Sequence, residues 1–143
     1  MFNKKPKIRD FPGWSMAIFG ALAVLLGLVG LIKPEIVLTI LGFEVLPRAE
    51  RAATDYTIVF MVTSSMASFN MGVYYIFAAL NDIKIFYRWT VPFRTLTFIV
   101  FTIVTLTGMA PMRFIGIGAW ELVGAAVTGY ALLRYDQQQK GAS

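Results

Sequence analysis

The chain has 143 residues, of which 57% are hydrophobic and only 15% charged, and its formal net charge is +5 at pH 7. Soluble domains carry about 45–50% apolar and about 25% charged residues, so this composition argues against a water-soluble globule and indicates a membrane protein. The chain contains neither cysteine nor histidine, which excludes disulfides, thiolate metal sites, histidine-ligated haem and Ser–His relays.

Four apolar stretches are long enough to cross a bilayer, whose hydrocarbon core of about 30 Å needs about 20 residues of helix. The spans are predicted at residues 14–32, 56–80, 89–109 and 114–133. We therefore predict one transmembrane domain over residues 1–143, an all-α integral membrane antiparallel four-helix bundle. The tail, residues 136–143, lacks an apolar anchor and is predicted to be disordered.

The basic residues predict the orientation of this bundle. Four spans put both termini on one side of the membrane, together with 9 of the 13 Lys and Arg residues. The positive-inside rule therefore predicts that both termini are cytoplasmic. The net charge is explained by this topology, so no nucleic-acid partner is predicted. The nine are Lys4, Lys5, Lys7, Arg9, Lys84, Arg88, Arg94, Arg134 and Lys140; the other four are Lys33, Arg48, Arg51 and Arg113.

The connection between the first two spans is predicted to contain a short interfacial helix. Pro34 suits a helix start and Gly42 a helix stop, and the apolar residues between them recur at helical spacing. This segment is too short to cross the bilayer and is expected at its outer surface, either as a cap or docking surface or as a simple cover of helix ends. A second start at Pro47 is expected to extend the second span outward by about two turns, pairing Arg51 with Asp55.

Glu121 is the leading site hypothesis, because ionisable residues inside a span are costly. It lies roughly 10 Å from the outer boundary. Gly118, Ala125 and Gly129 share its face and are predicted to let another helix pack closely, which would turn the carboxyl into the bundle. Glu121 is read either as a proton- or ligand-binding group or as a structural acid that ties helices, or a partner subunit, together. Its expected neighbours at similar depth are Thr63, Ser64, Thr102 and Thr105.

Arg94 is the second ionisable group expected inside a span. Counted from Trp89, it lies roughly 8 Å inside the cytoplasmic boundary, level with Asn70. We predict an Arg94–Asn70 hydrogen bond, with snorkelling of Arg94 to the headgroups as the alternative. A direct salt bridge with Glu121 is not expected, because the two residues are about 12 Å apart along the membrane normal by the same arithmetic. Pro92 is expected in the first turns of this span.

A second row of small residues, Ser64, Ser68 and Gly72, recurs at i+4 spacing in the second span. Small residues allow close approach of helices in membranes, so this row is predicted to be a helix-packing face.

The layout resembles the small four-helix inner-membrane proteins of bacteria, such as the DoxX-like and BphX-like groups. The shared features are the basic start before Trp14, a charged outer loop with LGF at Leu41–Phe43, and a late-span acid, here Glu121. The resemblance covers most of the chain as a hydropathy outline and implies a multi-pass protein of the bacterial inner (plasma) membrane. It assigns no site residues.

We expect a non-catalytic integral membrane subunit that packs against a larger membrane complex or associates with itself. The small-residue rows motivate this expectation, and no nucleophile–base pair or metal set favours an enzyme. No cofactor is predicted, and a bound lipid, quinone or pigment is left open beside the lipid bilayer itself and partner subunits. The alternative function is a small-solute or proton-coupled carrier that uses Glu121, which would need an oligomer.

Overall fold

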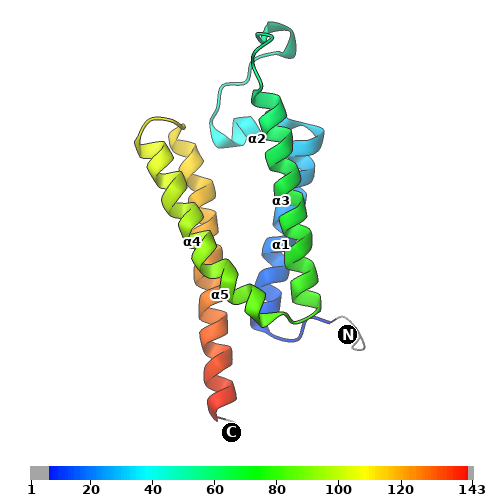
Figure 1. Cartoon of the computed structure of the whole chain (residues 1–143), viewed down its shortest axis with the longest axis vertical. Coiled ribbons are helices and arrows are strands. Elements are labelled where there is room, and N and C mark those ends of the chain that lie inside the picture. Colours follow the sequence, from blue (N-terminus) through cyan, green and yellow to red (C-terminus); the bar gives the residue numbers. More distant parts are fainter. Residues whose placement is uncertain (1–6, 142–143) are drawn as a thin grey trace.

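The computed structural model describes residues 7–141, which form five α-helices and two 3₁₀ turns and no strand (Figure 1). The elements are α1 (Phe11–Ile32), α2 (Pro34–Leu41), η1 (Arg48–Glu50), α3 (Thr57–Leu80), α4 (Lys84–Leu106), η2 (Met112–Phe114) and α5 (Ile115–Gly141). The all-α prediction is confirmed for these residues.

The long helices form two antiparallel pairs, α1 with α3 and α4 with α5. Figure 1 shows the pairs meeting where α1 begins and α3 ends, here called the basal end, and diverging toward the end that carries α2, here called the α2 end. The pairs contact each other mainly through α1 and α5, whereas α3 and α4 hardly touch. The fold is therefore two helix pairs that join at the basal end, with a further contact at the α2 end, where Phe43 lies against Phe114.

The buried core lies near the basal end. Its members from all four long helices include Met16, Tyr75, Tyr87 and Leu132. Tyr87 is fully buried, and its hydroxyl donates to the Ala78 carbonyl at 3.0 Å, which ties α4 to α3. A buried hydroxyl keeps its place only with such a partner, so this bond fixes how the two helices join.

Glycines and hydroxyls bring α1 and α3 together. A Cβ added at Gly72 would lie 2.5 Å from the Gly20 carbonyl oxygen, and the Ser68 hydroxyl donates to the Ala23 carbonyl at 3.1 Å. The predicted row is corrected at one position. Ser64 is exposed, and Ser65, one residue later, is buried on the packing face. A row at strict i+4 spacing drifts around a helix that has about 3.6 residues per turn, so its members do not all share one face.

The predicted short helix between the first two spans is present as α2. It begins at Pro34 and ends before Gly42, which has a φ of 84°, a conformation that glycine adopts without strain. Val37, Leu38 and Leu41 of α2 are buried, and α2 contacts both α1 and α3.

The predicted two-turn extension of the second span from Pro47 is wrong. Only a 3₁₀ turn follows Pro47, and α3 begins at Thr57, whose backbone N–H donates to the Asp55 carboxylate at 2.9 Å. Asp55 precedes the N-cap residue, Tyr56, and its carboxylate satisfies one of the free N–H groups in the first turn of α3. The expected Arg51–Asp55 pair is present, at 2.8 Å.

The third span begins earlier than predicted, at Lys84 instead of Trp89, and ends at Leu106 instead of Met109. Asp82, at φ 57°, completes a tight turn after α3, and the Lys84 ammonium binds both Asp10 and Asp82 there. The chain can therefore enter α4 at once, and Pro92 lies inside the helix rather than in its first turns.

The predicted disorder of residues 136–143 is wrong as far as Gly141, because α5 continues to that residue; residues 142–143 lie outside the described part. Three consecutive glutamines favour helix, and Arg88 holds the first residue of the expected tail, Asp136, at 2.6 Å. The fourth helix therefore extends beyond the length of the predicted span, residues 114–133.

Three helical segments are long and apolar enough to cross a membrane: Phe11–Ile32, Lys84–Leu106 and Met112–Gly141. With 24 residues, α3 is also long enough. It carries hydroxyl and amide side chains such as Ser64, Ser68 and Asn70, but no charged residue. A multi-pass membrane protein is therefore supported by length and composition.

Candidate functional site

Arg94 and Glu121 form an ion pair inside the bundle. The Arg94 Nε donates to Glu121 Oε2 at 2.7 Å, and the Arg94 side chain is only 4% exposed. The predicted Arg94–Asn70 bond is therefore wrong. Because α4 begins at Lys84, Arg94 lies about 15 Å along the helix rather than about 8 Å, and its long side chain reaches Glu121.

The guanidinium of Arg94 is enclosed by residues of three helices. Its Cζ lies 4.2 Å from the ring centre of Phe19 on α1 and 5.7 Å from that of Tyr75 on α3. A Cβ added at Gly124 on α5 would lie 2.2 Å from an Arg94 nitrogen. Snorkelling to the headgroups is thus contradicted, and Gly124 provides the space that the guanidinium occupies.

Sequence reasoning missed Gly124, although a signal for it existed. Gly124 follows Glu121 by three residues and therefore shares its face of the helix. The predicted row of small residues consists of Gly118, Ala125 and Gly129 and does not include Gly124. A glycine one turn from an acid inside a membrane helix leaves room for an arginine from a neighbouring helix, as Gly124 does for Arg94.

The three predicted packing residues of α5 lie against α4 or within the core. Added Cβ atoms would lie 3.4 Å from Phe98 at Gly118 and 3.6 Å from Val91 at Gly129, and Ala125 is buried. This row therefore packs within the chain, as does the row on α3.

The hydroxyls expected beside Glu121 make no hydrogen bond to it. Those of Thr63 and Thr105 donate to carbonyls of their own helices, at 2.8 Å and 2.9 Å. Ser64 is exposed, and the Thr102 hydroxyl is buried without a partner among residues 7–141. Such back-bonding is common for threonine in helices, which is why depth alone did not predict partners.

Glu121 differs from Arg94 in being accessible. Its side chain is 26% exposed, and within residues 7–141 its carboxylate makes no hydrogen bond beyond the one from Arg94. One carboxylate oxygen is therefore free to accept a bond.

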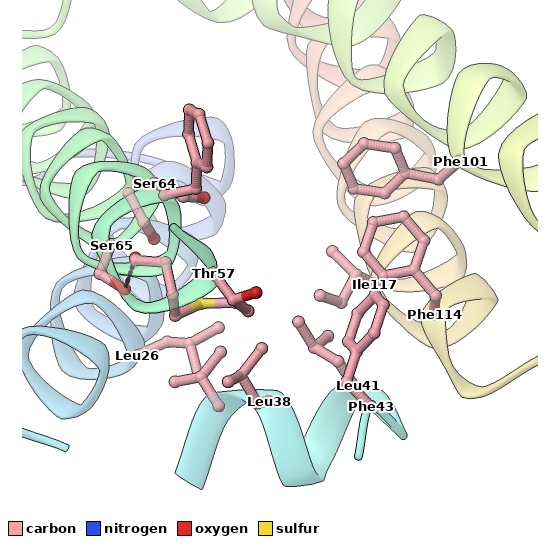
Figure 2. Close-up of a pocket in the computed structure, with 14 residues that line it drawn as sticks. Leu26, Leu38, Leu41, Phe43, Thr57, Ser64, Ser65, Phe101, Phe114 and Ile117 are labelled. Atoms are coloured by element: carbon pink, nitrogen blue, oxygen red, sulfur yellow. Dashed lines mark hydrogen bonds between the residues drawn. The ribbon is translucent and has the colours of Figure 1, made fainter. Parts of the chain in front are cut away.

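Two adjoining cavities separate the helix pairs, and together we call them the interpair groove. The cavity at the α2 end has a volume of about 550 Å³ and lies between residues such as Phe60 and Ser64 of α3 on one side and Phe101 and Phe114 on the other. Figure 2 shows these facing walls, with Leu38 and Leu41 of α2 closing the cavity from one side.

The second cavity continues the groove toward the basal end. Its volume is about 640 Å³, and it shares Ser68, Phe101 and Ile117 with the first. Among residues 7–141, Arg94 and Glu121 are the only charged residues that line either cavity. The interpair groove is thus an apolar passage with one ion pair in its wall.

No group of three or more acidic side chains that could hold a metal ion occurs in the described residues. No protein-family model, curated protein or solved structure matches the chain.

Proposed function

We propose that the protein crosses the bacterial inner membrane four times, with α3 as the second span and both termini in the cytoplasm. The length of α3, its antiparallel packing on α1 and the excess of basic residues at the basal end support this topology. In this arrangement the α2 end faces outward.

We further propose that the protein is non-catalytic and binds a membrane amphiphile in the interpair groove. The observation that carries this proposal is the groove itself, an apolar passage between the helix pairs whose wall holds the Arg94–Glu121 pair. Ligand pockets commonly have volumes of about 300–1,000 Å³ and combine apolar walls with a few polar groups, as these cavities do.

The source of the ligand follows from the opening of the groove. Because α3 and α4 hardly touch, the groove is bounded on that side by side chains such as Met71 and Phe93, which are themselves exposed. In a bilayer that side borders acyl chains, so a molecule can enter from the lipid without crossing water.

Filling the groove tests this function. Ala67 lines the groove on α3 and is exposed, so Ala67→Phe should occupy the space without disturbing the core. Ala126→Phe on α5 is the matched control, because Ala126 is exposed but lines neither cavity. Each protein is purified in mild detergent and its bound lipids are identified by mass spectrometry.

We expect a lipid to co-purify with the parent and with Ala126→Phe, and to be depleted from Ala67→Phe. Equal lipid content in all three would contradict the groove as a binding site. A protein chain in place of a lipid would favour the subunit function below.

A membrane subunit is the second proposal, and an exposed feature of α5 favours it. Gly116 has open space around its Cα, and Ala126 lies exposed further along the same helix. The small-residue rows that first motivated a partner pack inside the chain, which weakens this case. A particle mass equal to one chain, with no co-purifying protein, would argue against it.

The carrier function stays a prediction centred on Glu121. The pairing of Glu121 with Arg94 means that transport would require this ion pair to open. Proton-driven uptake by liposomes that is lost in Glu121→Gln would support a carrier, and equal uptake by both proteins would contradict it.

A further inference from the structure

We propose that the interpair groove selects an uncharged amphiphile with a hydroxyl group, which donates a hydrogen bond to the free oxygen of Glu121. This inference rests on the proposed ligand-binding function and concerns the chemistry of the ligand. It follows from the charge, the hydrogen-bonding capacity and the position of the Arg94–Glu121 pair.

The charge balance of the site favours a neutral ligand. Arg94 and Glu121 compensate each other at 2.7 Å, and no other charged side chain of the described part of the chain lines the groove. An anionic head group would compete with Glu121 for Arg94, and a cationic one would compete with Arg94 for Glu121. Either would leave an uncompensated charge in an apolar environment, which is strongly unfavourable.

The free hydrogen-bonding capacity of the Glu121 carboxylate favours a ligand that donates a hydrogen bond. An ionised carboxylate only accepts hydrogen bonds, and the one bond to Glu121 among residues 7–141 comes from Arg94. The unpartnered Arg94 Nη1 is buried, whereas the Glu121 side chain is partly exposed. A ligand in the groove therefore meets an acceptor, Glu121, and a hydroxyl group satisfies it without adding charge.

The position of Glu121 explains why the rest of the ligand is apolar. Glu121 lies about 9 Å along α5 from Ile115, so the pair is well inside the membrane-spanning length of the helix. From there the groove extends past Phe101 toward α2 and past Trp89 toward the basal end. A chain or ring system attached to the hydroxyl group would fill these apolar parts.

Three probes of equal chain length separate these properties: a dibrominated octadecyl alcohol, its methyl ether and the corresponding fatty acid. Bromine quenches tryptophan fluorescence on contact, and Trp89 lines the groove. Trp14→Phe and Trp120→Phe leave Trp89 as the only reporter, and keep an aromatic ring beside Phe19. Quenching of Trp89 is then titrated with each probe.

We expect the alcohol to bind at least about tenfold more tightly than the ether, because a hydrogen bond to a charged group is lost in the ether. The acid, ionised at neutral pH, should bind more weakly than the alcohol. The double variant Arg94→Met/Glu121→Leu should bind alcohol and ether equally. Replacing a buried ion pair by apolar side chains of similar volume is often tolerated, so this variant is expected to fold.

The outcomes distinguish the two proposals. Equal binding of alcohol and ether, both abolished by Ala67→Phe, would overturn the hydroxyl preference and retain the groove. Tightest binding by the acid would also overturn it. Quenching that Ala67→Phe does not reduce would overturn the groove and the preference together. If the double variant fails to fold, the comparison of alcohol with ether in the parent still decides the preference.

Discussion

At the scale of single residues, the buried Arg94 affects the stability of the fold through its ion pair with Glu121. Removing one member of a buried ion pair typically costs about 3–5 kcal/mol, because the other charge is left unpaired. We therefore expect Glu121→Leu to lower the free energy of unfolding by about that much, and Arg94→Met/Glu121→Leu to recover most of the loss. Denaturant titration in detergent provides the measurement. Asn70→Ala should have little effect, and a large loss there would contradict the assigned pairing.

A side chain at position 124 should destabilise the fold, because the space beside Gly124 is filled by the Arg94 guanidinium, which Glu121 holds in place. We expect Gly124→Ala to lower the free energy of unfolding by about 1–3 kcal/mol through overpacking. Gly116→Ala on the same helix is the matched control, since no atom lies within 4 Å of its added Cβ. It should be neutral or stabilise by up to about 1 kcal/mol, as measured in the same titration.

Between elements, the contact of α1 with α3 depends on backbone approach at Gly72. Because its added Cβ would meet the Gly20 carbonyl rather than a movable side chain, the two helices would have to separate. Gly72→Ala is expected to cost about 1–3 kcal/mol and to lower the thermal midpoint in detergent. Ser64→Ala, on the exposed face of α3, should leave the midpoint unchanged.

The connection from α2 to α3 should lose stability in acid. The Thr57 hydroxyl and backbone N–H donate to Asp55 and lower the pKa of its carboxyl, and a backbone hydrogen bond followed by one from Arg48 lowers the pKa of Glu35. A lowered folded-state pKa stabilises the fold above the unfolded value, about 4 for these groups, and that contribution is lost as the pH falls through the folded-state pKa.

The measurement is the thermal midpoint between about pH 6 and about pH 3. The parent should lose stability below about pH 4, and Asp55→Asn/Glu35→Gln should start lower and lose less. An identical pH dependence in parent and variant would contradict a contribution from these two carboxylates.

For the whole molecule, the proposed topology can be tested without removing any native thiol, because the chain has no cysteine. Thr54→Cys at the α2 end and Gln138→Cys on α5 place thiols at exposed positions. An impermeant maleimide should label Thr54→Cys in intact cells and Gln138→Cys only after lysis. Asn81→Cys, in the turn between α3 and α4, should behave like Gln138→Cys; labelling of all three in intact cells would contradict the topology.

The sequence predicts features that local chemistry determines. The bounds of α2 follow from Pro34 and Gly42, and the Arg51–Asp55 pair follows from their spacing. The Arg94–Glu121 pair does not follow from the depth of Arg94 counted from Trp89, because α4 begins at Lys84. The interpair groove depends on how two helix pairs diverge, which no residue spacing within one helix encodes.

The uneven joining of the two helix pairs has a mechanical consequence. Between the pairs, Lys84 binds Asp10, Tyr87 binds Ala78 and Ser15 lies 3.2 Å from Thr128, and all these contacts are near the basal end. At the α2 end the pairs are linked through Phe43, which lies against Phe114, so we expect a slight rotation of α4 and α5 about the basal end to change the separation of Phe60 and Phe114 most. In the proposed topology, we therefore expect lateral pressure in the leaflet around α2 to change the width of the opening more than the same pressure in the opposite leaflet.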